Sequence, residues 1–313
     1  MQTEMVEGVQ VLECGALQPE GTELAPGNPS WLDTVRYIQD PVGFCRDHSA
    51  LYGPIFRAHV FGKNTIMIGE SAAAKMTFNG DQKYTEIALP GPTMDMFGEE
   101  SLFQRPDLHG VRKRALNHHL GAMVLDRYLP RIEAGIERGL NTWQDGAVDI
   151  YPAVEEISFD TLCSLMLGVD PTDPKAFDGL PIGNAADLKK IYGRYFNGFY
   201  GLTRWNVPWT VYGRGRAARA RLLEFMRAVI ARRRAAENEH ADQDFVGSLL
   251  AQQDEGNEVF TDSFIENQCL LQLWGAHFEI TAMLASLVYQ LGQHPEVRSQ
   301  IREECGALET ADG

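Results

Sequence analysis

The chain has 313 residues, of which 44% are hydrophobic and 10% aromatic, enough to bury the core of one large domain or of two ordinary ones. With 28 basic residues against 43 acidic ones, the formal net charge is −15. Such a chain cannot present the broad cationic surface that nucleic acids require, so we expect no nucleic acid partner.

The cysteines and the N-terminus indicate a cellular compartment. The five cysteines lie far apart without the spacing of a zinc site, so we interpret them as reduced thiols and expect no metal site of that kind. The N-terminal residues contain no basic segment followed by an apolar run, which argues against a signal peptide or an N-terminal anchor. Both observations favour a soluble, cytoplasmic protein.

The first elements predicted along the chain include its only β structure. Residues 1–30 are expected to form an extended lead-in, because prolines and glycines interrupt their second half. A helix follows over residues 31–52, broken near Asp40-Pro41, since a residue before proline disfavours helical dihedral angles. Two β-rich runs within residues 55–68, joined at Gly62-Lys63-Asn64, predict a hairpin.

Beyond residue 70 the pattern is helical, apart from a proline- and glycine-rich loop at residues 88–98. Apolar residues recur at helical spacing most clearly between Leu125 and Trp143. Thr261 is expected to cap a long helix over residues 261–294. Further amphipathic patterns cover residues 153–168, 185–200, 215–240 and 243–253. The sequence therefore predicts one mainly α domain over residues 31–313 with a small β element.

The apolar run from Cys269 to Leu291 is long enough to span a bilayer, and it contains a single acidic residue, Glu279. A carboxylate at the bilayer centre costs about 3 kcal/mol, and the flanks lack the basic residues that orient a spanning helix. We therefore interpret the run as a helix buried in a large globular domain, apolar all round because protein surrounds it.

Three stretches of the chain resemble cytochromes P450, most closely the bacterial members related to retinoic-acid hydroxylases. They are PVGFCRDHSALYGPIFRAHVFGKNTIMIG, HGVRKRALNHHLGAMVLDRYLPRIEAGIERGLNTW and TDSFIENQCLLQLWGAHFEITAMLASLVYQLGQHPEVRSQIREE. The resemblance covers residues 30–305. It implies the cytochrome P450 fold, with haem b (iron protoporphyrin IX) as the cofactor.

The chain ends soon after the third stretch, before the E-x-x-R helix and the F-x-x-G-x-x-x-C-x-G loop whose cysteine binds the haem iron in this family. The resemblance therefore implies the N-terminal two-thirds of such an enzyme, C-terminally truncated. We expect no monooxygenase activity from this part alone. For a complete parent the resemblance implies haem-dependent monooxygenation, or peroxygenation, of a hydrophobic small molecule. The alternative is a haem-free or inactive helical fragment that binds an apolar ligand without chemistry.

The central helix departs from the family pattern (A/G)-G-x-(D/E)-T, because the corresponding residues are Gly275-Ala276-His277-Phe278-Glu279. The resemblance implies that Gly275 and Ala276 leave room for haem. Glu279 lies one turn beyond Gly275 on the same face. A carboxyl group in an apolar pocket resists ionisation, which suits a proton donor. Glu279 and His277 are therefore the candidate catalytic residues; the alternative is a hydrogen-bonded core acid at a close helix crossing.

The helix expected at residues 107–120 resembles the one that contacts the haem propionates in this family. His109 and Lys113 are four residues apart and share one helix face, with Arg112 beside them. The resemblance implies that they bind the propionates, although a lysine lacks the forked geometry of arginine. The alternative is a solvated basic face.

Two stretches would line the substrate cavity by resemblance, residues 86–103 and the aromatic-rich residues 192–212. The candidate substrate contacts are Leu89, Met94, Phe97, Leu102 and Phe278. Apolar walls of this kind imply a hydrophobic substrate, whereas the alternative is ordinary packing. Residues 192–212 also leave open a peripheral membrane contact. The basic residues 214–234 are either a solvated helix face or a docking surface for a ferredoxin or flavin reductase, and peroxide is the alternative oxidant.

Overall fold

The computed structural model describes residues 5–6, 9–10, 24–80, 89–102, 106–143, 146–201, 203–236 and 244–311. Within the predicted lead-in, β1 (Met5–Val6) pairs antiparallel with β2 (Val9–Gln10), and most of the other lead-in residues lie outside the described ranges. The chain forms two compact units, Met1–Pro90 and Gly91–Gly313. The single domain expected over residues 31–313 stays a prediction.

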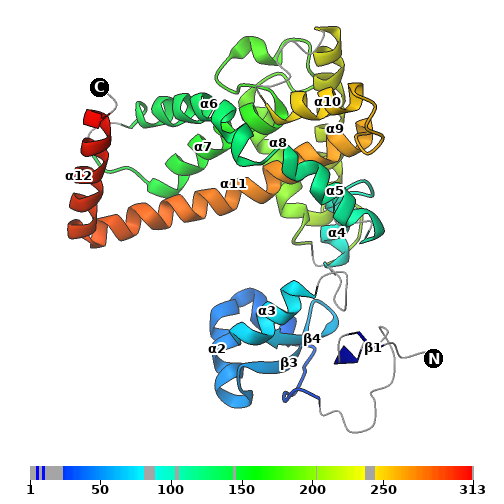
Figure 1. Ribbon diagram of the computed structural model, residues 1–313. Coiled ribbons are helices and arrows are strands. Elements are labelled where there is room, and N and C mark those ends of the chain that lie inside the picture. Colours follow the sequence, from blue (N-terminus) through cyan, green and yellow to red (C-terminus); the bar gives the residue numbers. More distant parts are fainter. Residues whose placement is uncertain are drawn as a thin grey trace. The chain divides into compact units, whose positions relative to one another are not determined.

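Between residues 24 and 80, the described part of the first unit has three helices and a hairpin (Figure 1). These are α1 (Asp33–Gln39), α2 (Pro41–Tyr52), β3 (Ile55–Val60), β4 (Lys63–Ile68) and α3 (Ser71–Asn79). The predicted break at Asp40-Pro41 is confirmed. Asp40 caps α2 by accepting a hydrogen bond of 2.8 Å from the amide of Gly43, while Pro41 occupies the first turn, where its missing N–H costs nothing.

The predicted hairpin is present, but its turn lies one residue earlier than expected. β3 and β4 are antiparallel with Val60 opposite Lys63, so Phe61 and Gly62 form the turn. Both have positive φ, 53° and 74°, as a two-residue turn that matches the strand twist requires. Every second residue of β3 is buried, and these side chains pack against Phe44 of α2.

The second unit is helical throughout the residues described. Its elements are α4 (Gly91–Phe97), α5 (Pro106–His118), α6 (Ala122–Leu140), α7 (Ile150–Leu162), the π-helical turn η1 (Cys163–Leu167), the 3₁₀ turn η2 (Pro174–Phe177), α8 (Ala185–Gly198), α9 (Val211–Ala235), α10 (Phe245–Asp254), α11 (Asp262–Gln293) and α12 (Pro295–Ala311). The loop expected at residues 88–98 was wrong, because α4 occupies most of it. Pro92 is compatible with a helix since it lies in the first turn.

The long predicted helix is confirmed as α11, and Thr261 caps it by accepting a hydrogen bond from the amide of Phe264. Figure 1 shows that α11 runs alongside α7 and that its C-terminal end meets α12. The helix is buried all round from Phe264 to Leu271, but beyond Leu273 only His277 and Thr281 are buried. All-round burial was therefore wrong for the second half. Among the described residues, no helix is long and apolar enough to cross a membrane.

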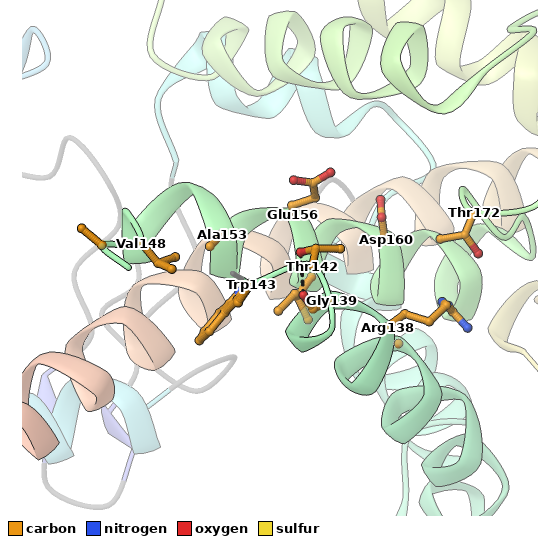
Figure 2. Close-up of a pocket in the computed structure, with 12 residues that line it drawn as sticks. Arg138, Gly139, Thr142, Trp143, Val148, Ala153, Glu156, Asp160 and Thr172 are labelled. Carbon is orange, nitrogen blue, oxygen red and sulfur yellow. Dashed lines mark hydrogen bonds between the residues drawn. The ribbon is translucent and has the colours of Figure 1, made fainter. Parts of the chain in front are cut away.

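Two pairs of neighbouring helices shape this unit, α8 with α9 and α6 with α7. A Cβ atom added to Gly198 of α8 would lie 2.8 Å from the Cα of Gly215 of α9, so glycine at this crossing lets the two backbones touch. By contrast, α6 and α7 leave between them a cavity of about 570 Å³ (Figure 2). Arg138 and Trp143 line it from α6 and the residues just after it, and Glu156 and Asp160 line it from α7.

Candidate functional site

Beyond Leu273, one face of α11 is open. A Cβ atom added to Gly275 would meet no atom within 4 Å, and Glu279, one turn on, is exposed. Exposed residues continue at helical spacing as far as Leu287, and from Ser286 to Gln290 every residue is exposed. This open face consists of Gly275, Glu279, Ala282, Met283, Ser286 and Leu287. The half-buried Ala276 lies at its edge. Glu279 and Gly275 thus share a face as predicted, but Glu279 lies at the surface and not in an apolar pocket.

His277 points to the opposite side of α11, where α7 packs. Its side chain is buried, its Nε2 lies 3.3 Å from the carbonyl oxygen of Glu155, and its Nδ1 has no hydrogen-bond partner among the described residues. Burial lowers the pKa of His277, which favours the neutral imidazole. We therefore assign His277 to the packing between α11 and α7, and not to the open face.

Thr281 shares this buried side. Its hydroxyl donates to the carbonyl oxygen of His277 at 2.7 Å and lies 2.9 Å from the hydroxyl of Ser158 on α7. The threonine nearest to the family's position is therefore committed to helix packing. Within the first two turns of the open face, Glu279 is the residue with a polar side chain.

Two predicted substrate contacts lie in one aromatic cluster formed by α4, α8 and α11. The ring of Phe97 lies 4.9 Å from those of Phe199 and Trp274, centroid to centroid. Phe278 packs against Phe196 at 3.7 Å and is half-buried. Because Phe97 is only 2% exposed, its side chain belongs to the core of the unit. Phe278 is the more accessible member of the pair.

The other predicted substrate contacts lie outside this cluster. Met94 is a half-buried residue of α4, and Leu102 is half-buried in the segment that follows this helix. Leu89 is half-buried at the end of the first unit.

Two of the predicted propionate-binding residues, His109 and Arg112, bind the segment that precedes α5. His109 of α5 is buried, and its Nδ1 lies 3.0 Å from the carbonyl oxygen of Leu102. Arg112 is also buried; it donates to the carbonyl oxygen of Ser101 at 2.9 Å and forms an ion pair with Glu100. Lys113 is exposed. The structure thus brings His109 and Arg112 together on one side of α5, with a carboxylate already bound to Arg112.

This segment also connects α5 to α11. Gln268 donates to the carbonyl oxygen of Glu100 at 3.2 Å, and the guanidinium carbon of Arg112 lies 5.2 Å from the ring centroid of Phe264. Phe264 lies about 16 Å before Gly275 along the helix axis. Glu100 was not predicted, because its partner Arg112 is 12 residues away, beyond the reach of any helical or strand pattern.

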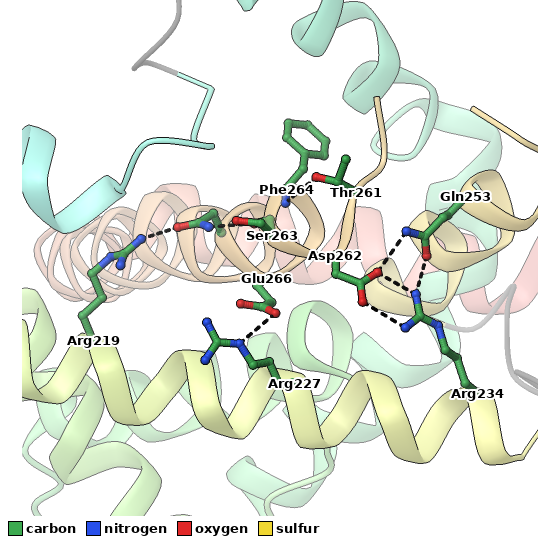
Figure 3. A network of polar contacts seen from close by, with 10 residues as sticks. Arg219, Arg227, Arg234, Gln253, Thr261, Asp262, Ser263, Phe264 and Glu266 are labelled. Atoms are coloured by element: carbon green, nitrogen blue, oxygen red, sulfur yellow. Dashed lines mark hydrogen bonds and ion pairs between the residues drawn. The ribbon is translucent and has the colours of Figure 1, made fainter. Parts of the chain in front are cut away.

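Three of the basic residues of α9 hold α11 (Figure 3). Arg219 binds the side chain of Asn267, Arg227 pairs with Glu266 at 3.2 Å, and Arg234 pairs with Asp262 at 2.6 Å. Hydrogen bonds from Arg234 and Gln253 lower the pKa of Asp262 to about 2. These contacts fix the N-terminal half of α11 and leave its second half to pack mainly on α7.

The described residues fit one side of a haem. Gly275 keeps the backbone of α11 clear of side-chain atoms, as the approach of a flat macrocycle requires. In cytochromes P450 the iron is held by a cysteine thiolate. Cys163 and Cys269 are fully buried, and burial raises the pKa of both thiols, so neither fits that role. The chain therefore fits the distal side of haem, and these two core cysteines do not fit its thiolate side.

Known proteins match most of this chain. The putative cytochrome P450 120 of Synechocystis sp. is 28% identical over 282 residues, which cover 89% of this chain and 60% of that protein. The taxane 13-alpha-hydroxylase of Taxus cuspidata is 23% identical over 304 residues, 92% of this chain and 60% of that protein. The chain thus spans less than two-thirds of the length of these relatives.

A solved structure gives the same result. Retinoic-acid-bound cyanobacterial CYP120A1 superposes with a TM-score of 0.77 and 28% identity, covering 91% of this chain and 63% of that one. This match confirms the predicted fold class and the resemblance to bacterial proteins related to retinoic-acid hydroxylases. The family model for cytochrome P450 matches residues 23–311. With nearly its whole length matched, the chain belongs to the cytochrome P450 family.

Proposed function

We propose that this chain forms the distal side of the haem site in a monooxygenase that oxidises a hydrophobic small molecule. The open face of α11 carries the proposal, because its side-chain-free start at Gly275 is one turn from a carboxyl group at Glu279. When bound, haem supplies the activation of dioxygen or peroxide that oxygen insertion needs. Gly275 and Ala276 leave space for it.

Glu279 is proposed as the acid–base residue of this face. Its carboxyl group can hold a proton and return it to an oxygen atom bound nearby, the task that a hydroxyl group has in the family pattern. The haem and a substrate would cover the open face and with it this carboxyl group. Glu279 would then act with peroxide as the oxidant, as an alternative to electrons from a ferredoxin or flavin reductase.

His109, Arg112 and Lys113 are proposed to hold the haem propionates. Arg112 already binds one carboxylate, that of Glu100, through one of its terminal nitrogens, while the other donates to the carbonyl oxygen of Ser101. Binding would therefore exchange one carboxylate for another at Arg112 and recruit the exposed ammonium group of Lys113.

The substrate is proposed to be a hydrophobic small molecule that contacts Phe278 and its neighbours. Two named relatives support this class: the taxane 13-alpha-hydroxylase of Taxus cuspidata and an abscisic acid 8'-hydroxylase of Oryza sativa, while CYP120A1 was solved with retinoic acid. The residues that stay candidates for lining the substrate site are Leu89, Met94, Phe97 and Leu102. Of these, Phe97 would act through the aromatic cluster.

The haem site is tested with Gly275→Leu in the full-length protein containing this sequence. An added Cβ atom meets no atom within 4 Å there, so the fold should persist while the larger leucine side chain excludes the haem. We expect loss of the thiolate-type Soret band of the reduced, carbon monoxide-bound form. Gly292→Leu is the matched control, because Gly292 lies about 25 Å further along α11 and also faces open space. A full band in Gly275→Leu would contradict the position of Gly275 beside the haem. No band in the wild type would leave the haem-free apolar-ligand binder as the better assignment.

The oxidant is tested separately with Glu279→Gln, which keeps the shape of the side chain and removes its proton exchange. Products of retinoic acid carrying one added oxygen atom are measured by mass spectrometry with hydrogen peroxide, and again with dioxygen plus a ferredoxin and its reductase. We expect peroxide-driven turnover to fall by about 100-fold, the lower range for losing one acid–base group. Unchanged peroxide turnover in the variant contradicts the role of Glu279 without affecting the haem assignment.

A further inference from the structure

A hollow of about 310 Å³ lies at the surface between α8 and α9. Its lining residues are Arg194, Asn197, Tyr200, Val211 and Arg214. Two of the five are cations and none is an acid, although acidic residues outnumber basic ones by 43 to 28 in the chain. The hollow therefore concentrates positive charge at one place on a protein that is negative overall.

Neither arginine of this hollow has a carboxylate partner among the described residues. Arg194 is exposed. Arg214 donates from Nη1 to the carbonyl oxygen of Trp209 at 2.9 Å, which orients its guanidinium group and leaves its other donors available. By contrast, Arg227 and Arg234 of the same helix are paired with acids of α11. Arg194 and Arg214 thus keep charged donors for a ligand.

The close contact of α8 with α9 fixes the spacing of these two arginines. A Cβ atom added to Gly215 would lie 2.5 Å from the Cα of Gly198 and 3.4 Å from the carbonyl oxygen of Arg194. Arg214 directly precedes Gly215, and Arg194 lies about one turn before Gly198. Because the backbones touch here, both side chains start from fixed points, which reduces the ordering needed to bind a common anion.

A row of aromatic rings leads from the hollow towards the open face of α11. The ring centroid of Tyr200, which lines the hollow, lies 5.3 Å from that of Phe196, and Phe196 lies 3.7 Å from Phe278. Tyr200 is 65% exposed, while Phe196 and Phe278 are half-buried, so each ring keeps area for a ligand. Phe278 directly precedes Glu279. An apolar chain that starts in the hollow can therefore follow these rings to the open face.

We propose that Arg194 and Arg214 bind the carboxylate of the substrate, an amphipathic carboxylic acid whose apolar chain lies along Tyr200, Phe196 and Phe278. A guanidinium group offers a planar fork of donors that matches carboxylate oxygens, and a carboxylate has one oxygen for each of the two groups. The inference rests on the proposed function, because it assigns the polar end of a molecule whose apolar end lies towards Glu279.

The probe is dodecanoic acid, titrated by isothermal calorimetry at pH 8 into the full-length protein containing this sequence, below the concentration at which the acid aggregates. Dodecanol is the matched ligand, with the same chain length and no charge. We expect the acid to bind more tightly than the alcohol. Arg194→Gln/Arg214→Gln should raise the dissociation constant of the acid by about tenfold or more, because charge-assisted hydrogen bonds are lost. Its affinity for dodecanol and its thermal unfolding should match the wild type.

The control variant is Arg221→Gln/Arg302→Gln, which removes the same charge at two exposed positions outside the hollow. Its affinity for the acid should stay at the wild-type value, and an equal loss would mean diffuse attraction and overturn the proposal. Equal affinity of the wild type for acid and alcohol would overturn it as well.

The apolar path has its own variant, Phe278→Ala, which should weaken binding of the acid and of dodecanol by a similar factor. Unchanged affinity for both ligands would overturn the path along the rings. None of these measurements depends on the haem band. A protein that binds the acid through its two arginines but gives no haem band would keep the carboxylate site and lose the proposed function, so the two failures are distinguishable.

Discussion

Among the described residues, Asp160 is the carboxyl group with the most informative pKa shift. Burial, together with the negative charge of Glu156, raises the pKa of Asp160 from 3.8 to about 6. Figure 2 shows both carboxyl groups on the same side of α7, beside the cavity that separates this helix from α6. A raised pKa in the folded state means that ionisation of Asp160 opposes folding. Its cost is therefore absent below pH 4, grows as the pH rises to about 6, and is constant above.

Asp160→Asn should therefore stabilise the protein at neutral pH. We expect the free energy of unfolding to rise by about 1 kcal/mol at pH 7.5, a value reduced because part of the carboxyl group is solvated. At pH 3.5 the variant and the wild type should be equal, since both side chains are then neutral. Urea denaturation at the two pH values measures this difference. Asp178→Asn, at an exposed carboxyl group, should change neither value, and a gain at pH 3.5 would contradict the electrostatic cause.

At the scale of elements, Arg219 of α9 closes the C-terminal end of α4. A helix leaves its last carbonyl groups without partners, and Arg219 donates to those of Met96 at 2.8 Å and Phe97 at 3.3 Å. It also binds Asn267 of α11 (Figure 3). One guanidinium group therefore joins three helices.

Arg219→Met should lower the free energy of unfolding by about 3 kcal/mol, because buried carbonyl oxygens lose charged donors. Amide hydrogen exchange should accelerate most in α4, which this side chain fastens. Arg234→Met is the control on the same helix. Its pair with Asp262 is about half exposed, so we expect a loss below about 1 kcal/mol. Equal losses in the two variants would contradict the special role of Arg219.

The elements were predictable where local chemistry decides their limits. Thr261 marks the start of α11, and Asp40-Pro41 marks the boundary between α1 and α2. In both cases the capping side chain accepts a hydrogen bond from an amide three residues further on, so the signal is local in the sequence. The turn of the hairpin was misplaced by one residue, since a positive φ at Phe61 is not a preference of phenylalanine. α4 was missed because a proline in the first turn is compatible with either a loop or a helix.

The candidate site was predictable only as far as helical spacing reaches. Spacing correctly put Gly275 and Glu279 on one face of α11, yet it could not tell which face α7 would cover. His277 contacts the backbone of Glu155, 122 residues away, and the carboxylate bound to Arg112 comes from a segment that precedes α5. Contacts of this range are set by tertiary packing and leave no local signal.

At the scale of the molecule, two exposed tryptophans stand out between α8 and α9. Trp205 is 70% exposed and Trp209 is 75% exposed, within the stretch for which the sequence left a membrane contact open. Tryptophan favours the interface between lipid and water because its ring is apolar and its N–H group can stay hydrated. With a net charge of −15, the chain is repelled by anionic lipid, so any such contact must be apolar.

Trp205→Ala/Trp209→Ala should therefore reduce binding to neutral phosphatidylcholine vesicles in flotation assays by about tenfold, the equivalent of about 1.4 kcal/mol. Adding phosphatidylserine should weaken wild-type binding, and raising the salt concentration should restore it, because salt screens the repulsion. Trp31→Ala is the control, since Trp31 is 78% exposed but lies in the first unit. If Trp31→Ala reduces binding as much as the double variant does, vesicle attachment reflects exposed aromatic area in general. If neither variant reduces it, the segment between α8 and α9 takes no part in membrane contact.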